Sequence, residues 1–260
     1  MNAAQLTVDA DLTAAAHGAV DEVIASLPVS LAPARLPRVE LIALSGSSED
    51  WPTRLAVVAR EGARGVTVVA PTRPADAGPD RIPVVVDYEY ASNPAVPGAA
   101  RAASKIGAAL LEIRATAVRE VTERALLLDL FALARRLGGS PVASSRVVLE
   151  SDAFLAIRGR LADGRPLLVN VSRTSARTPG AEARMLGADA GLTASFPAPS
   201  AARPARVVIS DFDGARTLPT LYETSHRATW RRLRDLVHAG GTATDLADLA
   251  ADDAALPPHD

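Results

Sequence analysis

The sequence predicts an α/β protein in which a parallel sheet is followed by an α+β portion with a mostly antiparallel, open sheet. Three short segments between residues 39 and 91 are apolar throughout, and helix or turn sequences separate them. Wholly apolar strands are typical of a parallel layer that is buried on both faces. Beyond Asn93-Pro94 the strand candidates follow one another across turns, and Asp163-Gly164 is a strong hairpin signal.

The chain before the first apolar strand is expected to hold one helix and a linker. Residues 10–27 carry apolar side chains at helical spacing, Asp11 or Thr13 can cap this helix, and Pro28 ends it. Residues 28–38 contain three prolines and indicate a loop. The parallel layer is then expected to contain strands at 39–44, 66–69 and 83–88, and a helix at 49–61 whose first turn tolerates Pro52.

The second portion is expected to carry one long helix beside its sheet. Thr122 is the candidate cap of that helix, and Gly138-Gly139 ends it. The predicted helices are 97–106, 122–137 and 223–239, and the predicted strands are 108–118, 145–149, 153–161, 166–172, 183–186, 192–195 and 206–209. The predicted domains are 1–38 (N-terminal helix and linker), 39–91 (truncated parallel-sheet portion), 92–240 (C-terminal α+β domain) and 241–260 (acidic tail).

Composition excludes several classes of chemistry. The chain has no cysteine, which removes disulfides, thiolate zinc sites, iron–sulfur clusters and cysteine nucleophiles together. The net charge of −2 gives no general attraction for nucleic acid or anionic membranes. The four histidines are scattered, so no metal site is predicted. Without a signal-peptide pattern or a membrane-length apolar run, we expect a cytoplasmic protein with neither a nucleic-acid nor a membrane partner.

One acidic motif follows a predicted strand. The segment that begins at Arg206 ends in Asp211-Phe212-Asp213-Gly214, which is similar to the first motif of haloacid-dehalogenase-type phosphatases. That fold also needs a downstream lysine, whereas the only lysine of this chain is Lys105. A strand that ends in an Asp-Gly turn is therefore the favoured interpretation.

A run of motifs carries a family resemblance. Residues 39–71 contain a strand, a small-residue turn, a helix and a strand ending in Val69-Ala70-Pro71, and the segments 87–94, 104–107 and 124–133 follow with DYEYASNP, SKIG and a helix bearing Asp129. Over residues 39–250 this resembles the Gfo/Idh/MocA (glucose–fructose oxidoreductase/inositol dehydrogenase) family. The resemblance implies a partial Rossmann-like sheet, NAD(P) bound near Ser45 and Gly46, and an oligomer formed through the open sheet of the second domain.

Three departures from the family pattern concern its chemistry. Ala70 stands where the family has a lysine, and Leu133 stands where a histidine follows Asp129 by four residues. Alanine and leucine cannot transfer protons. The first 38 residues contain no glycine-rich turn, which in this family would place the cofactor pyrophosphate at a helix N-terminus. The first half of the dinucleotide site is therefore expected to be absent.

These observations predict an oxidoreductase-like protein without hydride transfer, with no cofactor, acting as a binding or oligomer-partner subunit. Its partner would be a second copy or a full-length homologue, bound through the C-terminal sheet. The alternative is an NAD(P)-dependent oxidoreductase, or a lyase, isomerase or imine reductase, on the same scaffold. The candidate acid–base residues are then Asp129, Tyr88 and His226, with Tyr222 as a further candidate, and the candidate cofactor-binding residues are Ser45 and Gly46.

Overall fold

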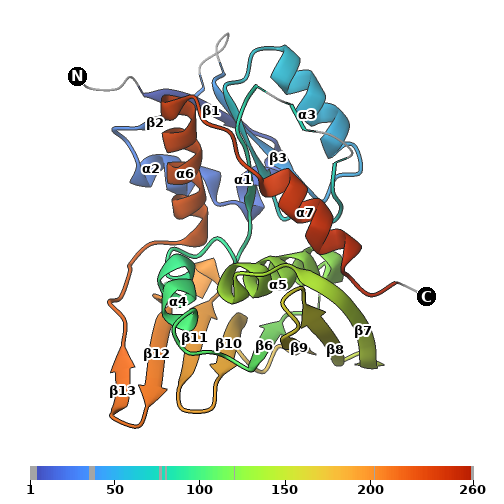
Figure 1. The fold of residues 1–260 in the computed structure, drawn as a ribbon. Coiled ribbons are helices and arrows are strands. Elements are labelled where there is room, and N and C mark those ends of the chain that lie inside the picture. The colour runs from blue at the N-terminus through green and yellow to red at the C-terminus, as the bar shows by residue number, and fades with distance from the viewer. Residues whose placement is uncertain are drawn as a thin grey trace. The chain divides into compact units, whose positions relative to one another are not determined.

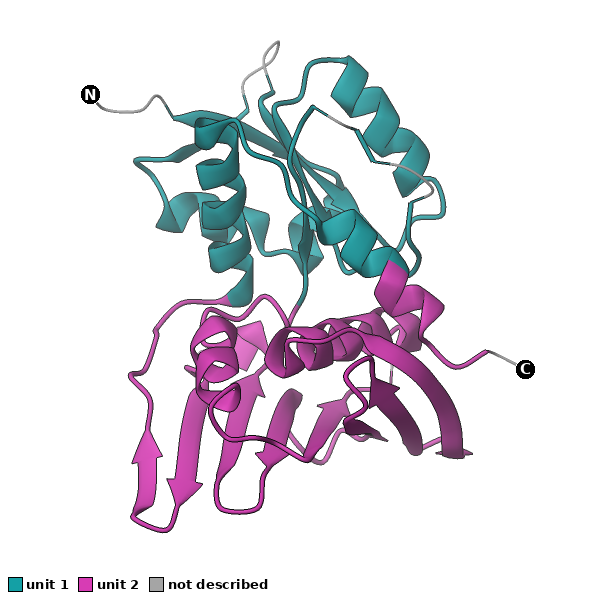
Figure 2. Cartoon of the chain, in the orientation of Figure 1, with its two compact units in different colours: residues 1–88, 225–250 teal, residues 89–224, 251–260 magenta. Residues whose placement is uncertain are grey.

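The computed structural model describes residues 5–34, 39–75, 78–79, 81–119, 121–201 and 203–258. The chain forms two compact units, shown in Figure 2: unit 1 is residues 1–88 and 225–250, and unit 2 is residues 89–224 and 251–260. Unit 1 contains a five-stranded parallel sheet, and unit 2 contains an eight-stranded, mostly antiparallel sheet. The predicted fold class is therefore confirmed.

Unit 1 is a parallel sheet with helices on its faces (Figure 1). Its strands lie in the order β2-β1-β3-β4-β5, and every neighbouring pair is parallel. Its elements are β1 (Leu6–Ala10), α1 (Leu12–His17), α2 (Val20–Ser26), β2 (Leu31–Pro33), β3 (Leu41–Ser45), α3 (Trp51–Arg60), β4 (Gly65–Val69), β5 (Val84–Asp87) and α6 (Ser225–Ala239). Helix α7 (Asp245–Ala254) begins in unit 1 and ends in unit 2.

The N-terminal segment corrects the prediction of one helix and a linker over residues 1–38. Strands β1 and β2 lie there, and the predicted helix is divided at Gly18 and Ala19, where Ala19 has a left-handed φ of 45°. Strand β1 was not predicted because only its alternate side chains are buried. Strand β2 was not predicted because it has three residues and ends in proline. The first half of the parallel sheet is thus present in a short form.

One face of this sheet is covered by α1, α2 and the late helix α6. Trp230, Leu233 and Val237 of α6 join a core cluster with Leu6 and Leu41 of the strands. A Cβ atom on Gly65 would lie 2.8 Å from the Val237 side chain, so glycine on β4 allows the close approach of α6. Residues 225–239, predicted within the 92–240 domain, therefore belong to unit 1.

Unit 2 is built around the sheet β13-β12-β11-β10-β6-β9-β8-β7, in which only the β6–β9 pair is parallel. Helices α4 and α5 pack on one face of this sheet (Figure 1). The elements are α4 (Val96–Ala103), β6 (Leu110–Ala117), α5 (Glu123–Gly138), β7 (Val142–Ser151), β8 (Phe154–Leu161), β9 (Pro166–Arg173), β10 (Gly180–Leu186), β11 (Gly191–Pro197), the 3-10 turn Pro199–Ala201, β12 (Arg206–Asp211) and β13 (Gly214–Thr217).

Most strands of unit 2 agree with the sequence prediction, including the hairpin between β8 and β9 at Asp163-Gly164. Strand β13 was not predicted. It pairs with β12 across the acidic motif, with Asp211 opposite Gly214, so the motif is a hairpin turn as favoured above. Among the described residues, no helix combines the length and apolar character needed to cross a membrane.

Candidate functional site

The carboxyl edge of the parallel sheet holds the candidate site residues of unit 1 that the sequence indicated, Ser45 and Gly46. In open parallel sheets, ligands bind outside the carboxyl ends of the strands, where the strand order reverses. In unit 1 the chain moves from β1 outward to β2 and then returns to the other side of β1 at β3. The reversal therefore lies between the ends of β1 and β3.

A carboxylate occupies this position. Asp11 follows β1 directly, and its Oδ1 accepts a hydrogen bond from the Ala14 backbone N–H at 2.7 Å, which caps α1. Its Oδ2 accepts the Ser45 backbone N–H at the end of β3 at 2.8 Å, and Arg54 Nη1 of α3 lies 3.0 Å from the same oxygen. These two backbone N–H groups and the Arg54 guanidinium could have bound an anionic ligand. In this chain they bind the Asp11 carboxylate instead.

Ser45 and Gly46, the predicted cofactor-binding residues, lie at this edge and make contacts within the chain. The Gly46 N–H donates to Val69 O at 2.7 Å, and Gly46 O accepts the Thr72 N–H at 3.0 Å. A Cβ atom on Gly46 would lie only 2.4 Å from Pro71 Cα. Glycine is thus needed here because the β3 turn passes close to the segment after β4.

Ala70 directly follows β4 at the same edge. Its backbone adopts a left-handed φ of 48°, which is unusual for a residue other than glycine, and its N–H donates to Asp87 O at 3.2 Å. The methyl group packs against the core cluster of unit 1. This position supplies no group that could exchange a proton.

The predicted residue His226 contacts Asp87, which sequence reasoning missed, and the predicted residue Tyr88 is the next residue after Asp87 in the chain. Asp87 ends β5, and its Oδ2 lies 2.8 Å from His226 Nδ1, while its Oδ1 accepts the Thr229 hydroxyl at 3.0 Å. All three side chains are buried, and Tyr88, which is also buried, follows Asp87 in the chain. A carboxylate at the end of the apolar run 84–86 was the signal that could have found it.

Asp129, the third predicted catalytic residue, belongs to unit 2. Its carboxylate accepts the backbone N–H groups of Tyr90 and Ala91, each at 2.8 Å. Burial raises the pKa of Asp129 to about 7, although these two hydrogen bonds and the nearby Arg136 guanidinium act in the opposite direction. Leu133, four residues further along α5, is fully buried. Asp129 therefore fixes the backbone at the start of unit 2. The further candidate Tyr222 lies on the surface, where its side chain is 83% exposed.

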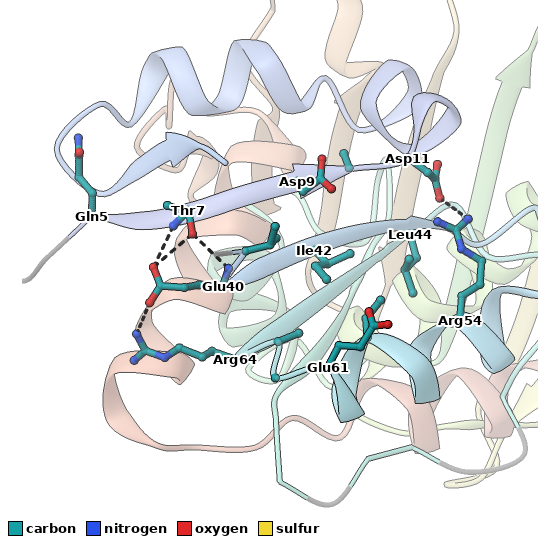
Figure 3. Close-up of a pocket in the computed structure, with 15 residues that line it drawn as sticks. Gln5, Thr7, Asp9, Asp11, Glu40, Ile42, Leu44, Arg54, Glu61 and Arg64 are labelled. Carbon is teal, nitrogen blue, oxygen red and sulfur yellow. Dashed lines mark hydrogen bonds and ion pairs between the residues drawn. The ribbon is translucent and has the colours of Figure 1, made fainter. Parts of the chain in front are cut away.

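A groove of about 880 Å³ runs along β1, β3 and α3 of unit 1. Figure 3 shows an ion pair at each end, Arg54 with Asp11 and Arg64 with Glu40, the latter at 2.7 Å. Its lining consists of Gln5, Thr7, Asp9, Ala10, Asp11, Val39, Glu40, Ile42, Leu44, Arg54, Val58, Glu61, Gly62, Ala63 and Arg64. Both arginines are neutralised and carboxylates outnumber them, so the groove does not suit a phosphate.

The Glu40 carboxylate is ionised firmly. Burial on its own would raise the pKa of Glu40, but the hydrogen bond and charge of Arg64 and two hydrogen bonds from Thr7 hold this pKa below its usual value. The ion pair at this end of the groove therefore persists at neutral pH. In the described part of the chain, no group of three or more histidine, cysteine, aspartate or glutamate side chains is placed to hold a metal ion.

Comparisons with known proteins give structural likeness only. No family model matches the chain, and no curated protein matches it. Among solved structures, UDP-N-acetylglucosamine 3-dehydrogenase GnnA from Acidithiobacillus ferrooxidans has a TM-score of 0.67 at 14% identity, covering 97% of this chain and 96% of that chain. KijD10, a 3-ketoreductase from Actinomadura kijaniata in complex with TDP-benzene and NADP, has a TM-score of 0.69 at 12% identity and covers 97% of both chains.

A third neighbour, levoglucosan dehydrogenase in complex with NADH, has a TM-score of 0.69 at 13% identity, covering 96% of this chain and 94% of that chain. These neighbours are oxidoreductases of the Gfo/Idh/MocA type that the sequence resembles. At such identity the likeness extends to the fold, and the chemistry must be argued from the residues of this chain.

Proposed function

We propose that this protein is an oxidoreductase-like binding or oligomer-forming subunit that does not transfer hydride from NAD(P). One observation carries the proposal: the Asp11 carboxylate accepts the N–H groups at the start of α1 and at the end of β3, the edge at which sheets of this kind bind a dinucleotide pyrophosphate. A pyrophosphate brought to the same donors would meet a negative charge and would compete for N–H groups that are already bonded.

The fit of NAD(P) can be tested against the residues present. The neighbours KijD10 and levoglucosan dehydrogenase are complexes with NADP and NADH, respectively. In this chain the turn after β1 contains Asp11 and no glycine, and Ala70 and Leu133 offer no proton-transfer group. The residues present therefore do not fit NAD(P).

The proposed assembly role uses the eight-stranded sheet of unit 2. Its buried side chains, such as Ile113 and Ala183, face α4 and α5, whereas Arg114 and Glu182 of the opposite face are exposed or half-buried and lie directly across from each other. A face with charges of both signs is self-complementary, which suits a second copy or a homologue.

The test is a titration of the purified chain with NADH and NADPH, followed by cofactor fluorescence, together with sedimentation of the same sample. We expect no saturable cofactor binding up to about 1 mM and a mass that rises with protein concentration. Levoglucosan dehydrogenase is the positive control for NADH. An Asp11→Ser variant keeps a capping oxygen and loses the charge, so binding gained there would locate the exclusion at Asp11. Micromolar binding by the unaltered chain would contradict the proposal.

The contact between Asp87 and His226 favours a second candidate, an acid–base enzyme that uses no dinucleotide. A carboxylate bonded to Nδ1 of an imidazole orients the ring and sets its tautomer, an arrangement used by histidines that act as general acids or bases. If a screen of lyase and isomerase substrates finds turnover, His226→Gln is expected to lower kcat by about 100-fold or more. Thr229→Val, which touches the same carboxylate, is the control and should retain most activity. Equal losses in both variants would indicate a structural role.

A further inference from the structure

Three arginines gather on the open face of the unit 2 sheet. Arg146 of β7 lies directly opposite Arg158 of β8, and Ser144 lies opposite Arg160 in the same ladder. Side chains two residues apart on a strand share a face, so all four side chains project from one side. The arginines are exposed, as their position on the uncovered face requires.

This arrangement costs stability unless something compensates for it. Like charges directly opposite each other on neighbouring strands repel. None of the ion pairs within the described residues includes Arg146, Arg158 or Arg160. Asp163, in the following turn, is paired with Arg165, and Arg160 Nη1 donates to Gly164 O at 2.5 Å. Among the described residues, Arg146 and Arg158 therefore have no acidic ion-pair partner.

A cavity of about 300 Å³ accompanies the cluster. It is lined by Ser144, Ser145, Arg146, Arg158, Gly159, Arg160 and Pro166. A Cβ atom on Gly159 would lie 2.9 Å from Ser144 O, so glycine at this position allows β8 to lie close to the backbone of β7 beside the cavity. Guanidinium groups and a hydroxyl group surround this space, and they supply many donors and no carboxylate.

We propose that Arg146, Arg158 and Arg160 form a binding site for a phosphoryl group. Arginine presents paired N–H donors that match phosphate oxygens, and a doubly charged anion between two opposed arginines would replace their repulsion by attraction. The volume suits a phosphate or diphosphate with a small organic part. The site uses unit 2 residues only and does not depend on the proposed loss of hydride transfer.

The test measures binding of inorganic phosphate and pyrophosphate to the full chain by calorimetry at low ionic strength, beside thermal unfolding. We expect saturable binding, tighter for pyrophosphate, and a rise of Tm with ligand. Arg158→Gln should weaken pyrophosphate binding at least 10-fold, because it removes one charge-assisted hydrogen-bond contact to the anion. Without ligand this variant should melt at the same or a higher temperature, because the repulsion is relieved, so lost binding would not reflect unfolding.

Arg206→Gln is the matched control, since Arg206 is exposed on the same face, on β12, outside the cavity. It should leave the affinity for pyrophosphate unchanged. Equal weakening by Arg206→Gln and Arg158→Gln would indicate general charge attraction and would overturn the site. Absence of pyrophosphate binding by the unaltered chain would also overturn the site. If, in addition, Arg158→Gln lost the ability to self-associate, the arginines would instead bind an acidic protein surface.

Discussion

Replacing Asp129 with alanine is expected to lower the free energy of unfolding of unit 2 by about 3 kcal/mol. The loss follows from two buried backbone donors, Tyr90 N and Ala91 N, which bond to the Asp129 carboxylate at 2.8 Å and would be left without it. Each buried, unsatisfied donor costs roughly 1–3 kcal/mol, and the truncated side chain adds a small cavity.

The same residue makes the free energy of unfolding of unit 2 depend on pH. Burial raises the pKa of Asp129 to about 7 in the folded state, above the value of about 3.9 expected when unfolded. The folded state therefore binds the proton more tightly between these values. The contribution of Asp129 to stability is complete below about pH 4 and is lost as the pH rises towards 7. Asp129→Asn, which cannot titrate, should abolish this slope.

The measurement is chemical unfolding of the unaltered chain and Asp129→Asn from pH 4 to pH 8, followed by far-UV circular dichroism. Circular dichroism is needed because both tryptophans, Trp51 and Trp230, lie in unit 1. The difference in stability between the two proteins should grow as the pH falls from 7 to 4. Asp213→Asn, on the exposed β12–β13 turn, is the control. A constant difference across this range would show that Asp129 does not titrate there.

Replacing Gly46 with alanine is expected to destabilise unit 1 by about 3 kcal/mol, at the upper end of the usual cost of overpacking. The new Cβ would lie 2.4 Å from Pro71 Cα and 2.7 Å from Pro71 N, and backbone atoms cannot move aside as a flexible side chain can. The shift would also strain the hydrogen bonds that join Gly46 to Val69 and Thr72. The carboxyl edge of the sheet would lose the arrangement that holds Asp11.

Tryptophan fluorescence reports this loss directly, because Trp51 and Trp230 are fully buried in unit 1. The unfolding midpoint in urea should fall for Gly46→Ala without a comparable change in unit 2. Gly98→Ala is the matched control, since its Cβ would meet no atom closer than 3.9 Å and alanine favours the helix α4. A normal midpoint for Gly46→Ala would mean that the β3 turn and the Pro71 segment are not in contact.

Local pattern was sufficient for elements that bury long or regular apolar surfaces. Helix α5 and the strands β3, β4 and β5 were predicted because their apolar runs are unambiguous and glycine or proline marks their ends. Strand β1 was missed because Thr7 and Asp9 face the polar groove on one side, so the run is not apolar throughout. Helix α6 was predicted as a helix, but its partner sheet could not be, because that contact spans more than 130 residues of chain.

The site shows a similar division between local and distant information. Ala70 and Leu133 were recognised as chemically inert from their identity alone. The role of Asp11 was predicted only in part, as a helix cap, because its other partners, Ser45 and Arg54, lie more than 30 residues away. His226 was predicted without Asp87, since the two meet only when α6 packs against β5. The cross-strand pair of Arg146 and Arg158 needed the strand register.

The connectivity of the two units also sets an order for synthesis. Unit 2 is inserted between β5 and α6, so the ribosome completes most of it before the chain that covers the apolar face of the first sheet has emerged. Leu6 and Leu41 therefore remain without Trp230 and Leu233 until late in translation. The sheet of unit 1 is thus synthesised first, but its packing against α6 is completed only near the end of translation. A nascent chain stalled before α6 would be the form most dependent on chaperones.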